Sequence, residues 1–379
     1  MGNQTTTLFQ TLKELPIPLS YSQCVLHKHE LLICGGYDRR ACYSYHTVKN
    51  EYKFICEYPS NVRLNGHCVV KLVDNNNSNN KHSSQITLLS FGSGGCSIKG
   101  HTLVMKYVSV WNNDDDNHNQ WIPFTDNHNN PIIIAKDYNY YCGARAVISG
   151  SNNSLLFITY FENNISVFDL NTFQFIKHDT LPIHDWICYH CFVSNSENGQ
   201  GQEIMMKTNK QNYQMLLFYK KTGLLIEYDE DNNTFQFFKL PVCEDIEQFY
   251  KYAYVCINNV ILLLGGSNYN NSVVSKSVHK YSIRENKWMT FKNILPSSLF
   301  DCVAVLSEED NNIHIIGGED DKRIALSVHT KTKLRVWDFS YLSKNEIKFI
   351  IQHWIRGLKI KIGWIYDFDK IIMKYSRMK

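Results

Sequence analysis

The sequence predicts an all-β protein, a six-bladed β-propeller with a short C-terminal α-helical tail. Three observations predict it: a recurring order of short apolar strands, a glycine pair after the second strand of a unit, and aromatic residues spaced seven apart. A repeated four-stranded unit is typical of propellers, in which each blade buries its faces against its neighbours. We therefore expect one ring of blades over most of the chain.

The unit that follows Tyr252 shows the strand order most clearly. Its second strand, Ile261-Leu262-Leu263-Leu264, ends in Gly265-Gly266, and its last two strands carry Tyr281 and Trp288. Glycine after a buried strand permits a positive φ and a close approach of neighbouring backbones. Further glycine pairs stand at 35–36, 94–95 and 317–318.

Aromatic spacing identifies two further units that lack the glycine pair. The pairs seven apart are Tyr45 and Tyr52, Phe168 and Phe175, Tyr228 and Phe235, and Tyr281 and Trp288. Because seven is odd, two rings on one uninterrupted strand would face opposite sides of a sheet. We therefore expect a polar turn between them, so that each pair brackets a hairpin and its rings pack between adjacent blades.

Small residues mark the start of most units. A propeller is narrowest at its innermost strands, where a small apolar side chain fits. We expect five cysteines in these first strands, namely Cys24, Cys68, Cys142, Cys191 and Cys302.

The pattern of four apolar residues, Gly-Gly, an aromatic residue, six residues and tryptophan resembles the kelch repeat. Residues 261–266 with Tyr281 and Trp288 meet it in full, and the other units meet it in part. Residues 154–161 and 213–220 lack the glycine pair, and Trp337 is out of register. The resemblance covers residues 22–340 and implies a disc of four-stranded blades with binding loops on one face.

We expect three segments: an N-terminal tail at 1–6, a propeller at 7–340 and a basic helical tail at 341–379. The six blades are expected at roughly 22–60, 66–125, 141–180, 188–241, 252–296 and 300–340. Residues 9–16 resemble the exit from the fifth unit, Phe291 to Pro296. Because an open ring would leave bare sheet edges, we expect residues 7–15 to close the last blade.

The tail 341–379 has a helical pattern. Ser343 and Glu346 form a capping box, and apolar residues follow at helical spacing. Nine Lys or Arg against three Asp or Glu give the segment a net charge of +6. Two interpretations stay open: a helix docked on the propeller with a solvated basic face, or a helix that meets a membrane surface or a partner.

The first residues, Met1-Gly2-Asn3-Gln4-Thr5-Thr6, fit the myristoylation pattern, with Gly2 as the acceptor. A single acyl chain binds membranes marginally, so a stable anchor would need the basic tail as a second signal. The N-terminus lacks the apolar core of a signal peptide. We therefore expect reduced cysteines and a cytoplasmic protein, with membrane association through the two ends as an alternative.

Composition excludes some classes of partner. The net charge is +3 and 20% of residues are charged, so no strong field favours nucleic acid.

The cysteine- and histidine-rich run 184–191 invites a zinc interpretation. On one strand, however, Cys188 and His190 point one way and Cys191 the other, so we expect no metal and no cofactor.

Loops after the glycine pairs and loops between blades should open on the same face. We expect a subset of their residues to form a mouth that recognises an acidic or polar peptide. The candidates are Tyr37, Arg39, Arg40, Arg63, His67, Arg145, His184, Asp185, Trp186, Tyr269, Ser297, Lys322 and Arg323.

The resemblance implies a partner-recognition module, and we expect a non-catalytic, monomeric propeller that binds a protein. Some kelch-like propellers are copper oxidases or act on sugars, which need axial metal ligands or paired carboxylates. Neither set is visible in the motifs, nor is a phosphate-binding glycine loop. An enzyme acting on a carbohydrate or as an oxidase, and a membrane-tethered scaffold, remain the alternatives.

Overall fold

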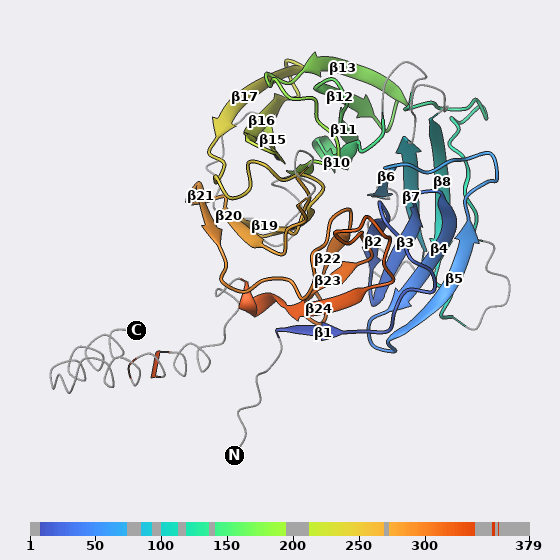
Figure 1. Cartoon of the computed structure of the whole chain (residues 1–379). Helices are drawn as coiled ribbons and strands as arrows, with labels where there is room; N and C mark the ends of the chain where they lie inside the picture. The colour runs from blue at the N-terminus through green and yellow to red at the C-terminus, as the bar shows by residue number, and fades with distance from the viewer. Residues whose placement is uncertain are drawn as a thin grey trace, which may run out of the picture. The chain divides into compact units, whose positions relative to one another are not determined.

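The computed structural model describes residues 8–73, 85–92, 100–112, 119–135, 141–194, 212–268 and 273–337, together with 351, 352 and 355. Within these residues the strands form six antiparallel sheets of four strands each. Figure 1 shows the sheets arranged around a central axis, with the innermost strand of each sheet nearest to it. The predicted six-bladed β-propeller is confirmed.

The first three blades follow one another along the chain. Blade 1 comprises β2 (Gln23–His27), β3 (Glu30–Gly36), β4 (Arg39–His46) and β5 (Glu51–Glu57). Blade 2 comprises β6 (Cys68–Leu72), β7 (Gln85–Gly92), β8 (His101–Val108) and β9 (Ile122–Pro123). Blade 3 comprises β10 (Arg145–Ser149), β11 (Leu155–Tyr160), β12 (Asn164–Asp169) and β13 (Gln174–Thr180), with the 3-10 turn η2 (Ser151–Asn153) between its first two strands.

The other three blades complete the ring. Blade 4 comprises β14 (Cys191–Ser194), β15 (Asn212–Tyr219), β16 (Thr222–Asp229) and β17 (Thr234–Leu240). Blade 5 comprises β18 (Ala253–Ile257), β19 (Val260–Leu264), β20 (Val278–Ser282) and β21 (Lys287–Thr290). Blade 6 comprises β22 (Val303–Ser307), β23 (Asn312–Ile316), β24 (His329–Lys333) and, from the other end of the chain, β1 (Phe9–Thr11).

The strand β1 supplies the outermost position of blade 6. It pairs antiparallel with β24, with Phe9 opposite Thr332 and Thr11 opposite Thr330. The link to blade 1 continues along the same edge, where Leu12 and Leu15 donate backbone hydrogen bonds to His329 and Ser327. Blade 6 therefore has no bare outer edge along β24.

The aromatic pairs bracket hairpins at the rim of the ring, as predicted. Tyr45 lies opposite Tyr52, Phe168 opposite Phe175, Tyr228 opposite Phe235 and Tyr281 opposite Trp288. Ring centroids within the pairs lie 4.9 to 5.1 Å apart. The rings also meet the preceding blade, since Tyr228 lies 5.1 Å from Phe157 and Tyr281 lies 4.8 Å from Phe218. They are part of the cores that lie between blades.

The glycine pairs mark places where two backbones meet. Gly265 and Gly317 have φ of 69° and 61°. A Cβ there would lie 2.2 Å from the carbonyl oxygen of Leu299 and 2.4 Å from that of Leu19, respectively. The next residues, Gly266 and Gly318, donate hydrogen bonds of 2.8 Å to those same carbonyls. Only glycine permits both the left-handed backbone and this approach of the inter-blade loop.

The innermost strands differ in register from the prediction. Cys24, Cys68 and Cys191 lie in β2, β6 and β14, whereas Cys142 lies before β10 and Cys302 immediately before β22. The expectation that all five cysteines lie in the innermost strands is therefore wrong for Cys142 and Cys302. A cysteine near the start of a unit does not by itself mark where the inner strand begins. No disulfide joins the cysteines that the structure describes.

Residues after the sixth sheet form a separate compact unit, Leu334–Lys379, which begins with the 3-10 turn η3 (Leu334–Val336). Ile351, Gln352 and Ile355 are helical. The myristoylation motif at Gly2 and the rest of the basic tail lie outside the described residues. Among the residues described, no helix is long and apolar enough to cross a membrane.

Candidate functional site

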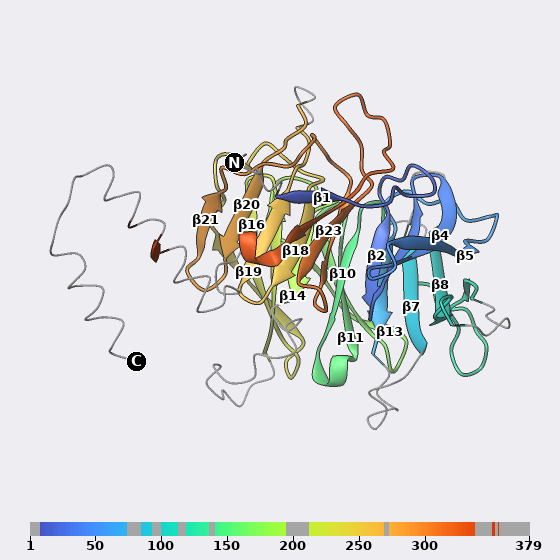
Figure 2. The ribbon, with the colours of Figure 1, turned by 90° about the horizontal axis from the view of Figure 1, so that it is seen from below.

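Two sets of loops open on one face of the ring, which we call the loop face. They are the loops between the second and third strands of a blade and the loops between consecutive blades. Figure 2 shows the ring from its edge, with the long loop between β23 and β24 projecting from this face. The predicted site residues that the structure describes belong to these loops or to the strand ends beside them.

Tyr37 and Arg39 lie at the turn between β3 and β4 and are exposed. Half of the Tyr37 surface is accessible to solvent, and its ring lies 5.7 Å from the ring of Tyr21. Arg40, by contrast, donates a 3.2 Å hydrogen bond to the Tyr58 carbonyl and pairs with Glu57 at 3.1 Å. Tyr37 and Arg39 are available to a partner, whereas Arg40 holds two strands of its own blade together.

Lys322 and Arg323 are exposed at the tip of the loop between β23 and β24. The Asp320 carboxylate accepts hydrogen bonds from the backbone amides of Lys322 and Ile324, at 3.0 and 2.9 Å. This Asp-centred turn fixes the loop locally. Both cationic side chains are therefore presented to solvent on a defined backbone.

Trp186 is more exposed than Tyr37, with 62% of its surface accessible to solvent. Its ring lies 5.1 Å from that of Phe161, which belongs to the neighbouring loop between β11 and β12. Asn163 of that loop donates a 2.9 Å hydrogen bond to the Ile183 carbonyl. The segment that carries exposed His184 and half-buried Asp185 is thereby held against blade 3.

Arg63 is exposed and Ser297 half-buried in loops between blades, and Tyr269 lies outside the described residues. His67 is fully buried, and its Nε2 lies 3.0 Å from the Cys34 carbonyl oxygen. Burial lowers the pKa of His67 to about 4. The expectation that His67 lines the binding surface is wrong, because its ring packs between blades 1 and 2.

A set of six residues, one before each innermost strand, surrounds the axis; we call it the axial ring. All six have a positive φ: Tyr21 (57°), Gly66 (64°), Gly143 (72°), Tyr189 (53°), Lys251 (58°) and Asp301 (50°). Backbone hydrogen bonds of 2.7 to 3.0 Å run from Gly143 to Gly66, Tyr189 to Gly143, Asp301 to Lys251 and Tyr21 to Asp301. Each bond joins one blade to the next.

Side chains of the axial ring meet one another although their blades do not all adjoin. Lys251 Nζ donates to the Tyr21 hydroxyl at 2.5 Å and lies 3.1 Å from Asp301 Oδ2. It also lies 4.6 and 4.9 Å from the ring centroids of Tyr21 and Tyr189, which are cation–π distances. Gly66 and Gly143 make room for the Tyr189 ring, since a Cβ on either would lie within 3 Å of it.

Burial governs the protonation of this cluster. Burial raises the pKa of Asp301 to about 6, and the nearby Lys251 ammonium opposes the rise. Burial, followed by the charge of Asp301, also raises the pKa of Tyr21, so its hydroxyl stays neutral at neutral pH. At pH 7 the cluster therefore holds a Lys251–Asp301 ion pair among neutral phenols.

A cavity of about 340 Å³ lies on the axis and is lined by all six innermost strands. Its walls include Cys24, Cys68, Arg145, Phe192, Tyr252 and Cys302. Arg145, predicted for the loop face, is half-buried in this wall, and its guanidinium lies 5.9 Å from the Tyr189 ring centroid. It faces the axis beside the axial ring.

Tyr21, Tyr189, Lys251 and Asp301 were not predicted as a group. A signal was present: each stands two residues before the inner strand of its unit, where the chain elsewhere has Gly66 and Gly143. A non-glycine residue at a position that needs a positive φ costs about 1 kcal/mol or more. Four such residues around one axis indicate that their side chains are needed there.

Comparisons with known proteins agree with this architecture. The family described as the Kelch motif matches residues 249–293. Kelch-like protein 38 of Danio rerio is 34% identical over 85 residues, which are 21% of this chain and 14% of that protein. Among solved structures, YjhT has a TM-score of 0.56 at 15% identity, over 84% of this chain and 95% of the other.

The structural likeness to YjhT supports the fold alone, because the identity is low. The motif match covers most of blade 5, the unit that meets the repeat pattern in full. Six four-stranded blades, the motif match and the Kelch-like relative together identify the chain as a kelch-repeat β-propeller.

Proposed function

We propose that the propeller binds a protein partner through the loop face, with the axial ring at the centre of the contact. One observation carries the proposal: Tyr37, Tyr21 and Tyr189 form a continuous aromatic row from an exposed loop to the axis. Tyrosine and arginine are enriched at the energetic centres of protein interfaces. The neutral phenols of Tyr21 and Tyr189, beside the Lys251–Asp301 ion pair, offer a partner both apolar surface and hydrogen bonds.

The surrounding charges favour an acidic or polar segment of the partner. Arg39, Arg63, Lys322 and Arg323 are exposed in loops of this face. Arginine binds carboxylates in a two-pronged geometry, which suits recognition of acidic side chains. The acidic neighbours Asp38 and Asp321 are also exposed, so the partner's charges must alternate to match them.

The test is a selection of peptides from a displayed random library on the immobilised protein. We expect enriched peptides to carry acidic residues and to bind the variant Tyr37→Ala, Arg39→Ala, Arg323→Ala about tenfold or more weakly than the parent. The matched control changes Val48 and Lys49 to Ala, in the turn between β4 and β5 on the opposite face, where both residues are exposed. Peptides that bind both variants equally well would overturn the proposal.

A further inference from the structure

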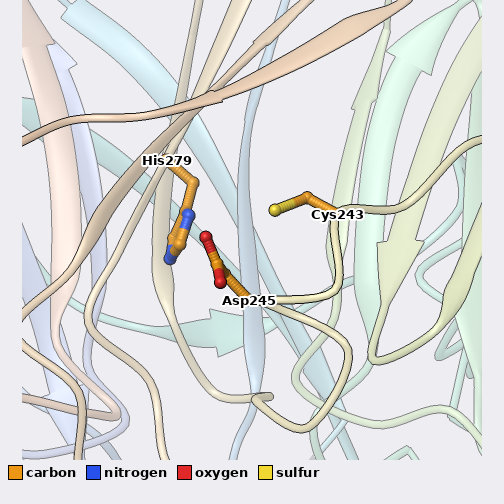
Figure 3. Close-up of side chains that lie close together, drawn as sticks. All are labelled: Cys243, Asp245 and His279. Carbon is orange, nitrogen blue, oxygen red and sulfur yellow. The ribbon is translucent and has the colours of Figure 1, made fainter.

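Three side chains with metal-binding atoms meet at the outer edge of blade 5. Cys243 and Asp245 lie in the loop between β17 and β18, and His279 lies in β20. Their thiol, carboxylate and imidazole atoms all lie within 4.8 Å of one another. Figure 3 shows the sulfur of Cys243 and the carboxylate of Asp245 both directed toward the His279 ring.

The hydroxyl of Thr290, in β21, stands among these three groups. It donates to Asp245 Oδ2 at 2.9 Å and lies 3.1 Å from His279 Nδ1 and 3.9 Å from Cys243 Sγ. Because that hydroxyl proton goes to Asp245, Nδ1 is the donor to Thr290. The three groups therefore converge on the Thr290 hydroxyl, and an ion can take its place once the exposed Thr290 side chain rotates away.

The loop that carries Cys243 and Asp245 is held in place on both sides of them. Before them, the indole Nε1 of Trp288 donates a 2.7 Å hydrogen bond to the Pro241 carbonyl. After them, buried Ile246 donates to the Cys243 carbonyl at 3.0 Å. The first bond ties the loop to β21, and the second closes a turn around Asp245, so the backbone of both residues is held beside blade 5.

The chemistry of the group selects the ion. Thiolate, imidazole and carboxylate together are typical ligands of zinc, which takes four ligands in a tetrahedron. His279 is 2% exposed, whereas Asp245 and Thr290 are exposed, which leaves one side open to water.

We propose that Cys243, Asp245 and His279 bind a zinc ion, with water as the fourth ligand. Zinc bonds of about 2.0 to 2.3 Å place neighbouring ligand atoms about 3.3 to 3.7 Å apart. The ligand atoms now lie within 4.8 Å of one another, and rotation of the Cys243 and Asp245 side chains brings them to these distances. Binding releases the thiol proton of Cys243, and the ring proton of His279 moves from Nδ1 to Nε2. The ion then ties the loop between blades 4 and 5 to the third strand of blade 5.

Cobalt substitution tests the site on the purified full chain. Titration with CoCl₂ should give one tetrahedral cobalt per chain, with a thiolate-to-metal charge-transfer band that one equivalent of ZnCl₂ abolishes. In Cys243→Ser the band should be lost and zinc affinity should fall at least about 100-fold, since removing even an outer partner of a ligand costs roughly 10- to 100-fold. Asp245→Asn should keep the band and weaken binding about tenfold.

Two control variants separate this site from other thiols and carboxylates. Cys256→Ser changes a half-buried cysteine of β18, and Asp231→Asn changes an exposed aspartate in the turn between β16 and β17. Both should bind cobalt and zinc like the parent. The proposal fails if equimolar cobalt gives no tetrahedral spectrum, if the band survives Cys243→Ser, or if Cys256→Ser removes it. Zinc should also raise the unfolding temperature of the parent but not that of Cys243→Ser.

Discussion

The rim hairpins and the axial ring both hold residues in the left-handed backbone region, but they fill those positions differently. At the rim, Asn50, Asn233 and Asn286 have φ of 52° to 53°, and each side chain accepts a hydrogen bond from the tyrosine that precedes the turn. Asparagine tolerates this conformation well. One local solution is therefore repeated in three blades.

On the axis the same backbone requirement is met by Tyr, Gly, Gly, Tyr, Lys and Asp in successive blades. Glycine would satisfy the backbone at all six positions, so the four larger residues bring strain with them. Their side chains also contact one another across blades. The same residue types recur at the rim turns because each turn builds its own blade. The axial positions hold different residues because their side chains form one group shared by several blades.

The largest effect should come from adding a side chain at a glycine of the axial ring. In Gly143→Ala the new Cβ would lie 2.8 Å from the Tyr189 backbone nitrogen at a φ of 72°. We expect a loss of about 2 to 4 kcal/mol in the free energy of unfolding, measured with urea. Lys251→Gly, at an equivalent position, relieves strain while losing contacts, and should change stability by about 1 kcal/mol or less. If Lys251→Gly lowered the free energy of unfolding as much as Gly143→Ala does, the Lys251 position would not be strained in the way proposed.

The next effect concerns pH. The pKa of Asp301 is about 6 in the folded protein and 3.8 in the unfolded chain, so the folded state holds the proton more tightly. This contribution to stability is present below pH 4 and is lost as pH rises to about 6, by on the order of 3 kcal/mol. Asp301→Asn should remove it. The free energy of unfolding of parent and variant, measured at pH 4, 5, 6 and 7, gives the difference. If it changed equally with pH in both proteins, Asp301 would not have the raised pKa.

The smallest effect should appear at the rim. Tyr281→Phe removes the hydroxyl that donates a 2.6 Å hydrogen bond to Asn286 and should cost about 1 kcal/mol. Asn286→Gly loses the same bond but keeps the left-handed turn, so it should cost a similar amount, and Asn286→Ala should cost more. Corresponding changes at Tyr228 and Asn233 should give the same ranking. A ranking that differs between the two blades would show that the turns are not one repeated unit.

Local patterns in the sequence predicted the blades well because a hairpin is decided by neighbouring residues. Tyr45 and Tyr52, or Tyr281 and Trp288, become opposite residues wherever the chain turns between them. The position of the innermost strands was harder to predict. Cys142 resembles Cys191 as a residue, yet it stands before β10, so a cysteine at this point of a unit does not mark the start of the strand.

The axial ring and the Cys243–Asp245–His279 group depend on contacts between distant parts of the chain. Tyr21 and Lys251 lie 230 positions apart in the sequence, and no local period links them. The zinc interpretation of 184–191 considered only a continuous run, whereas the proposed ligands combine a loop with a strand 34 residues beyond Asp245. His67 was misplaced for a related reason: a loop position in sequence does not reveal burial between two blades.

The pairing of β1 with β24 also governs the order of events during synthesis. β1 leaves the ribosome first, but its partner strand appears only after more than 300 further residues, since β24 begins at His329. Blades 1 to 5 can form hairpins as they emerge, while β1 waits as a three-residue segment too short to template pairing with other chains. Emergence of β24 thus allows β1 to complete blade 6, and a ribosome stalled before His329 would leave β1 without its partner strand.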